Sequence, residues 1–243
     1  MKKTISAIVF AVAIVIASIV LGNAVINRNR TERTVSVTGL GKADFTSDLI
    51  VWEGRFSKES TNLQQAYADL DHDKKIVTQY LVSKGIPEEK LVFSSVNTRK
   101  NTKPNYADNG NYIGEEFIGY ILEQNVQIDS ENVEKVEKIS REVTELLNQG
   151  VQFYSEAPRY YYTQIEDLKI EMVSRATENA RLRAEKIAKN SGSDLGNLVD
   201  ANMGIFQITG QNSGEDYSWG GTYNTSSKEK TASITMKLTY LVK

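Results

Sequence analysis

The sequence contains no cysteine in 243 residues and only one histidine. The absence of cysteine excludes disulfides, thiol catalysis, cysteine-ligated metals and a lipid anchor on an N-terminal cysteine. It does not decide the compartment, because exported proteins can do without disulfides. The formal net charge of −2 lacks the basic excess of a nucleic-acid-binding protein, so the sequence does not indicate a nucleic acid as a partner.

Motifs that carry known chemistry are also missing. The sequence has no catalytic-triad signature, nucleophile elbow, P-loop or dinucleotide fingerprint. Gly39-Leu40-Gly41 follows a predicted strand, but the third glycine and the helix of a phosphate-binding loop are absent. A turn or bulge is therefore expected at these glycines. We predict no catalytic and no cofactor-binding residues.

The single histidine is the one candidate metal ligand. His72 lies in Asp69-Leu70-Asp71-His72-Asp73, where carboxylates and an imidazole could bind a divalent metal. On a helix, however, His72 points away from the apolar face, and at most Asp69, His72 and Asp73 share a face, which is the solvent side. The sequence therefore predicts a solvated charged turn and no metal site.

The first 26 residues open with two lysines and are then almost wholly apolar. A membrane-spanning helix needs about 20 apolar residues, whereas the apolar region of a signal peptide needs only about 7–15. Gly22-Asn23-Ala24 could serve as a cleavage site, so a cleaved signal peptide stays open as the alternative. We favour an uncleaved anchor over residues 1–27 because the apolar run is long. Arginines follow on its other side, so charge alone does not fix the topology.

The remaining chain, residues 33–243, alternates strand and helix patterns. Amphipathic helices are expected from about Thr61 to Gly85, from Glu131 to Asn148 and within Thr163 to Gly196. The last strand, from about Thr231 to Val242, has the cleanest alternation of apolar and polar residues. The pattern predicts an α+β fold, with largely antiparallel sheets packed by three amphipathic helices. A break near residues 110–118 would separate two subdomains.

The third helix carries alanines at a four-residue step. Ala176, Ala180, Ala184 and Ala188 form a thin stripe, which Val173 and Ile187 are expected to widen. The rest of its surface is charged, as on a solvated side. Gly192 supplies the left-handed residue that ends the helix. This stripe predicts a helix that lies unusually close to a sheet or to another helix.

Two long polar segments are predicted to be loops, residues 100–116 and residues 209–229. The second contains the aromatic residues Tyr217, Trp219 and Tyr223, an unusual place for such side chains. They could hold a partner strand, a sugar polymer or lipid headgroups, or fold back over the sheet. We name these three residues as a candidate partner-binding loop. Tyr160-Tyr161-Tyr162 is expected to pack in the core and at an edge.

Several spacings together resemble the SIMPL-domain family, which includes bacterial periplasmic immunogenic proteins. The matching features, in chain order, are Val37, Gly39 and Gly41 before Asp48; Gly85-Ile86 before LVFSSV; the strand from Gly119 with its helix and Gly150; and the alanine series ending in Gly192, Leu195 and Gly196. Ser47 stands where the family often has proline. The match covers roughly residues 34–241.

The resemblance implies an exported domain that oligomerises, with ring-like assembly in at least one member, and suggests a link to envelope stress tolerance. It offers no catalytic residues. We therefore expect a non-enzymatic, membrane-tethered or periplasmic envelope protein that forms homo-oligomers. The alternative is a binding module for a small molecule or envelope polymer that uses residues 100–116 and 209–229. An enzyme ranks third, because Ser, Asp and Glu can act without a visible motif.

Overall fold

The computed structural model describes residues 2–28, 33–216 and 218–243, with side chains from residue 11 to 24 and from 33 onward. It has the predicted α+β architecture, with helices packed on antiparallel sheets. The chain divides into two compact units. One contains residues 1–40, 177–203 and 236–243, and the other contains residues 41–176 and 204–235. We describe each unit by itself.

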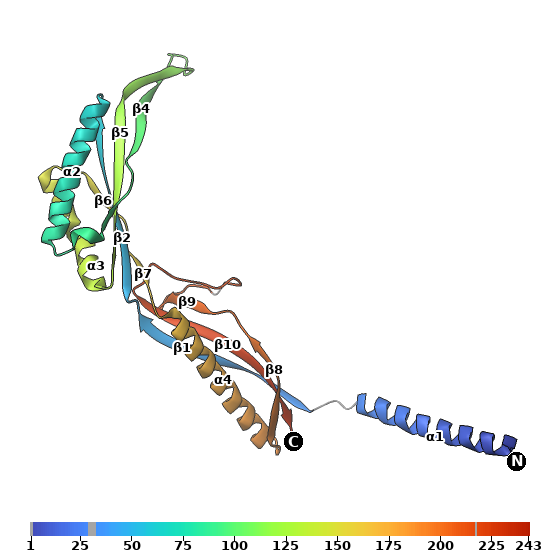
Figure 1. Ribbon diagram of the computed structural model, residues 1–243. Helices are drawn as coiled ribbons and strands as arrows, with labels where there is room; N and C mark the ends of the chain where they lie inside the picture. Colours follow the sequence, from blue (N-terminus) through green and yellow to red (C-terminus); the bar gives the residue numbers. More distant parts are fainter. Residues whose placement is uncertain (1, 29–32, 217) are drawn as a thin grey trace. The chain divides into compact units, whose positions relative to one another are not determined.

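The N-terminal segment forms the helix α1 (Lys2–Arg28), as predicted (Figure 1). Met1, and the side chains at both ends of α1, lie outside the described residues. In the part of the chain that the structure describes, no helix is both long and apolar enough to cross a membrane. The anchor and the signal peptide therefore remain predictions.

The larger unit is built on a sheet in which β5 and β2 are central. Its strand order is β3-β5-β2-β6, with β4 also paired to β5 and β7 to β2, and these pairings are antiparallel. The strands are β2 (Leu49–Ser60), β3 (Leu91–Phe93), β4 (Asn97–Tyr106), β5 (Tyr112–Ser130), β6 (Phe153–Ser155) and β7 (Arg159–Tyr161). The inward face of β2 is formed by Ile50, Trp52 and Phe56, which are fully buried.

Two helices cover one face of this sheet, α2 (Leu63–Ser83) and α3 (Val133–Glu142), as Figure 1 shows. Asn62 caps α2 by accepting a hydrogen bond from the Gln65 amide at 3.1 Å, one residue after Thr61, where the helix was predicted to begin. The left-handed Gly85 follows the end of α2, as predicted. A short 3₁₀ turn, η1 (Glu88–Lys90), leads into β3.

The second predicted helix changes its winding halfway. After α3 the chain continues as the 3₁₀ helix η2 (Val143–Gln149), which ends before the left-handed Gly150. Three residues per turn place Leu146 in line with Val143, and both are buried. Leu147, which a continued α-helical period would place on the inward face four residues after Val143, is exposed.

The predicted loop at residues 100–116 is wrong. The chain there forms a long hairpin of β4 and the first part of β5, which Figure 1 shows at the end of the sheet. A short turn closes it, in which Gly110 has a positive φ and the Ala107 amide donates to the Asn111 carbonyl at 2.9 Å. Residues 110–118, where a subdomain break was predicted, lie inside this hairpin.

The second sheet has the order β1-β10-β8, with β9 also paired to β10. Its strands are β1 (Thr34–Thr46), β8 (Leu195–Met203), β9 (Gln207–Gly210) and β10 (Glu229–Val242). The apolar face predicted for the last strand is confirmed, since Ile234 and Leu238 are buried. Residues 204–206 separate β8 from β9.

Strand β1 runs through Gly39-Leu40-Gly41 without a break, so the predicted turn is wrong. The reason lies at Gly41. A Cβ atom there would lie 2.2 Å from the Met172 carbonyl oxygen and 3.1 Å from the Ala176 amide nitrogen. The glycine is therefore present because the backbone of a helix approaches the strand, and not because the strand turns.

That helix is α4 (Ile165–Asn190), and its alanine stripe is confirmed. Ala176, Ala180, Ala184 and Ala188 are all buried, and Leu168 and Met172 continue the same four-residue step. Ile187 does not widen the stripe, because about half of its side chain is exposed. The left-handed Gly192 follows the helix as predicted.

Candidate functional site

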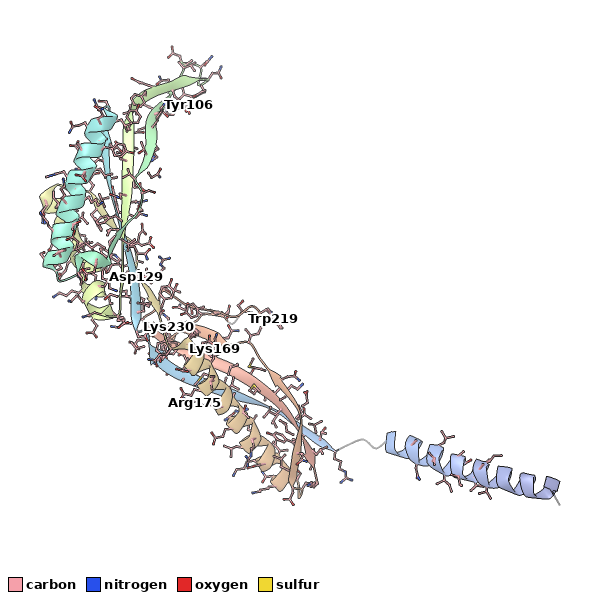
Figure 2. The ribbon with its side chains drawn as sticks, in the orientation of Figure 1. Tyr106, Asp129, Lys169, Arg175, Trp219 and Lys230 are labelled. Atoms are coloured by element: carbon pink, nitrogen blue, oxygen red, sulfur yellow. The ribbon has the colours of Figure 1, made fainter. Side chains whose placement is uncertain are left out.

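The hairpin of β4 and the start of β5, residues 97–118, is hereafter called the hairpin arm. Large apolar side chains on it are between 45% and 66% exposed: Tyr106, Tyr112, Ile113, Phe117 and Ile118. Tyr106 lies near the end of the arm (Figure 2). Exposed apolar side chains that gather on one element indicate a contact with a partner more strongly than scattered ones do.

Contacts within the hairpin arm give it a defined shape. The rings of Tyr106 and Tyr112 lie 6.1 Å apart, edge to face. Thr102 Oγ1 donates to Glu115 Oε2 at 2.8 Å across the two strands. A two-stranded ribbon by itself is only marginally stable in water, so a partner that covers the arm would stabilise both.

Charge is divided between the two strands of the hairpin arm. Strand β4 carries the basic residues Arg99, Lys100 and Lys103 and no acidic residue. The facing part of β5, residues 112–118, carries Glu115 and Glu116 and no basic residue. All of these side chains are exposed.

The sequence signal that could have revealed the arm is Asn109-Gly110, because Asn-Gly is a strong hairpin turn signal.

The predicted partner-binding loop occupies residues 211–228, between β9 and β10. Trp219 is 95% exposed and lies away from the sheets in Figure 2. Tyr223 is about half exposed, and its ring lies 6.4 Å from that of Tyr161, which places it against β7. Tyr217 lies outside the described residues. The structure therefore brings Tyr223, but not Trp219, into a ring contact with another described aromatic residue.

Buried amides hold this loop in place. The Gln207 side chain donates to the Ser218 carbonyl at 2.8 Å and accepts from the Thr222 amide at 2.7 Å. These bonds fix both ends of the turn that carries Trp219. Asn224 is also buried and donates to Glu215 within the same loop. An exposed tryptophan on a fixed turn is suited to contact a partner.

Lys230 of β10 is a buried cation that the sequence reasoning missed. It is 1% exposed, and its Nζ donates to Ser47 Oγ at 3.0 Å, to the Tyr160 carbonyl at 2.9 Å and to the Ser227 carbonyl. No carboxylate is among these partners, so burial lowers the pKa of Lys230 to about 8. The sequence feature that could have revealed it is its position in the strand. Alternate residues of a strand point to the same face, so Lys230 faces inward with Ala232 and Ile234.

We expect the stability of the protein to rise between about pH 8 and pH 10.5 through Lys230. In this range the folded lysine has lost its proton, whereas the unfolded lysine, with its ordinary pKa of 10.5, still holds one. Below that range Lys230 is charged in both the folded and the unfolded protein, so the full cost of burying the ammonium lowers stability. The gain should reach about 3 kcal/mol, from 1.36 kcal/mol for each pKa unit.

Denaturant unfolding of wild type and Lys230→Met across this pH range measures the effect. Tyr160 also has a pKa raised by burial, so the difference between the two proteins is the relevant quantity. Lys237→Met, at an exposed position of the same strand, is the control and should leave the pH dependence of wild type unchanged. If the free energy of unfolding changed with pH in the same way for wild type and Lys230→Met, Lys230 would not lose its proton in this range.

The candidate metal ligands around His72 do not share one surface. His72 is exposed, as predicted, whereas Asp73 is buried, so its predicted place on the solvent side is wrong. Asp73 belongs to the inward face of α2, three residues after Leu70 and four before Val77, and pairs with Lys58 of β2 at 3.0 Å. Among the described residues, no group of three or more acidic or histidine side chains is arranged to hold a metal ion.

Comparison with known families gives a match. The model of the SIMPL family, described as a protein of unknown function, matches residues 35–240. No curated protein matches the chain. Because the family model covers most of the sequence, the chain belongs to the SIMPL family.

Proposed function

We propose that this SIMPL-family chain is a non-enzymatic protein of the cell envelope that is tethered by α1 and forms homo-oligomers through the hairpin arm. The observation that carries self-association is the uncovered apolar surface of the arm. Its exposed side chains, Ile113 and Phe117 among them, belong to an ordered ribbon rather than to a loose loop. Water is a poor solvent for such a surface, and a second copy would remove it from water.

The charges of the hairpin arm favour another copy of the chain as the partner. If two arms pack face to face about a two-fold axis that runs along their length, β4 of one copy faces β5 of the other. Lys103 and its neighbours on β4 would then lie opposite Glu115 and Glu116 of the second copy. A partner of one charge sign would match only one of the two strands, whereas a second arm matches both.

Location in the envelope rests on the sequence. In the sequence, the apolar run that follows Lys2 and Lys3 is long enough for an anchor, and the resemblance to periplasmic members of the family favours the exported side. The same resemblance motivates a role in envelope stress tolerance. We assign no catalytic residue and no cofactor, because no motif or cluster in the described chain favours one.

Sedimentation of the full-length chain in a mild detergent tests self-association. We expect a defined oligomer for wild type. Ile113→Ser on the hairpin arm should weaken association by about tenfold or more, because it removes an apolar side chain from the centre of the contact. Ile170→Ser is the matched control, since Ile170 on α4 is 68% exposed and Ile113 is 66% exposed. A wild-type monomer, or equal effects of the two variants, would contradict the proposal.

A second candidate function is a binding module that uses the loop at residues 211–228. The observation in its favour is Trp219, which is almost fully exposed on a turn fixed by Gln207. This function predicts that Trp219→Ala abolishes capture of an envelope polymer, such as peptidoglycan in a pull-down assay, without changing the oligomer. Self-association through the hairpin arm predicts that Trp219→Ala leaves sedimentation unchanged.

A further inference from the structure

A groove of about 480 Å³ runs along α4 beside β1, within the smaller unit. Ligand pockets in proteins typically measure about 300–1,000 Å³, so its size suits a small molecule. Leu182 and Ile187 of α4 line it and are half-exposed, and the buried Val37 of β1 lines it from the strand. The groove thus offers an apolar surface that the described part of the chain leaves uncovered.

Both ionisable residues that line the groove are cations, Arg183 and Lys186. Arg183 Nη1 donates to the Thr38 carbonyl at 2.9 Å, which holds the guanidinium beside β1. Within residues 33–216 and 218–243, Lys186 has no hydrogen-bond or ion-pair partner, and no carboxylate pairs with Arg183. The positive charge beside the apolar surface is therefore not neutralised by the described part of the chain.

The edge of β1 beside the groove is already used by α4. The Leu40 amide donates to Asn179 Oδ1 at 3.2 Å, and the Thr38 carbonyl accepts from Arg183. An added peptide strand needs free amides and carbonyls at a sheet edge, and these groups are occupied here. A ligand of this groove must therefore bind through an apolar body and a negative charge instead of through backbone pairing.

We infer that the groove binds a single-chain aliphatic carboxylate, that is, a fatty-acid anion. Its chain lies along Leu182, Ile187 and Val37, and its carboxylate meets Lys186 and the outer side of Arg183. Burial of the chain supplies an energy proportional to the apolar area removed from water. The charge-assisted hydrogen bonds to the cations supply the selectivity for an anionic head. This inference does not depend on the proposed self-association.

Photolabelling of the full-length chain in lipid nanodiscs tests it. The probe is dodecanoate with a diazirine at the end of its chain, and the labelled peptides are identified by mass spectrometry. We expect labels within residues 177–190 and around Val37, with competition by plain dodecanoate but not by inorganic phosphate or dodecyltrimethylammonium. Labels confined to α1, or equal competition by the cationic amphiphile, would overturn the inference.

A pair of lysine variants on α4 provides the matched control. Lys186→Gln should reduce labelling of the groove about tenfold, the effect of losing one charge-assisted contact. Lys189→Gln removes the same charge from an exposed position outside the groove and should leave labelling within about twofold. Since the Lys186 side chain has no partner in the described chain, its replacement should not alter thermal unfolding. Equal labelling of the two variants would refute the assignment.

Discussion

Gly41→Ala is expected to lower the free energy of unfolding by about 3 kcal/mol, at the upper end of the cost of overpacking a core. The added Cβ would lie 2.2 Å from the Met172 carbonyl oxygen, which belongs to the backbone of α4. A side chain could rotate away from such a clash, whereas here the helix and the strand must move apart. The movement would also loosen the packing of the buried Ala176.

Denaturant unfolding of the full-length chain measures this cost, with Gly214→Ala as the matched control. Nothing lies within 4 Å of the position that a Cβ would take at Gly214, so the control should change stability by no more than about 0.5 kcal/mol. If Gly41→Ala were tolerated as well as Gly214→Ala, the close approach of α4 to β1 would not be a feature of the folded protein.

Lys58→Met is expected to cost about 3–5 kcal/mol, because it leaves a buried carboxylate without its counter-charge. Asp73 is 2% exposed, and Lys58 Nζ, 3.0 Å from its Oδ2 atom, is the main group that compensates its charge. Burial already raises the pKa of Asp73, and Lys58 opposes that rise. Without the lysine the pKa should rise further, since only the neutral acid is then tolerated.

The raised pKa of Asp73 determines how the stability that Lys58→Met loses, hereafter its deficit, depends on pH. A carboxyl group with a folded pKa above its unfolded value contributes stability at low pH and loses it as the pH rises through the folded pKa. The deficit should therefore shrink as the pH falls from about 7 toward the unfolded pKa, and unfolding curves at several pH values would show it. A deficit independent of pH would mean that lost packing, and not the buried charge, destabilises the variant.

Another lysine–aspartate pair on α2 is the control for this variant. Lys75 Nζ lies 2.7 Å from Asp71 Oδ2, and both side chains are largely exposed. Exposed pairs contribute only about 0–1 kcal/mol, so Lys75→Met should have little effect. The double variant Lys58→Met/Asp73→Leu should recover most of the loss, because a buried ion pair can be replaced by apolar residues at little cost.

The elements that were predicted correctly are those with one buried and one exposed face. The alternation of β10 from Ile234 to Tyr240 and the four-residue step of α4 each follow from such a division, and burial of Ala180 and Ile234 agrees with it. The hairpin arm was missed for the opposite reason. Neither of its faces is buried, so no alternation marks its strands, and its Pro104 and many polar residues resemble a loop.

The buried charges could not be predicted because their partners are distant in the sequence. Asp73 is compensated by Lys58 on another element, and Lys230 is held by groups from three separate segments. A helical or strand period places such residues on a face but cannot supply the partner that makes their burial tolerable. Of the candidate site, the sequence therefore predicted the aromatic loop with Trp219, and the structure added the hairpin arm.

Cross-linking of single-cysteine variants in native membranes tests self-association through the hairpin arm most directly. The chain has no cysteine, so each variant carries one reactive thiol and gives a clean background. With a short bis-maleimide, Ile113→Cys on the arm should give covalent dimers, whereas Ile170→Cys, equally exposed on α4, should stay monomeric. Dimers in equal yield from both positions, or from neither, would contradict an assembly built on the hairpin arm.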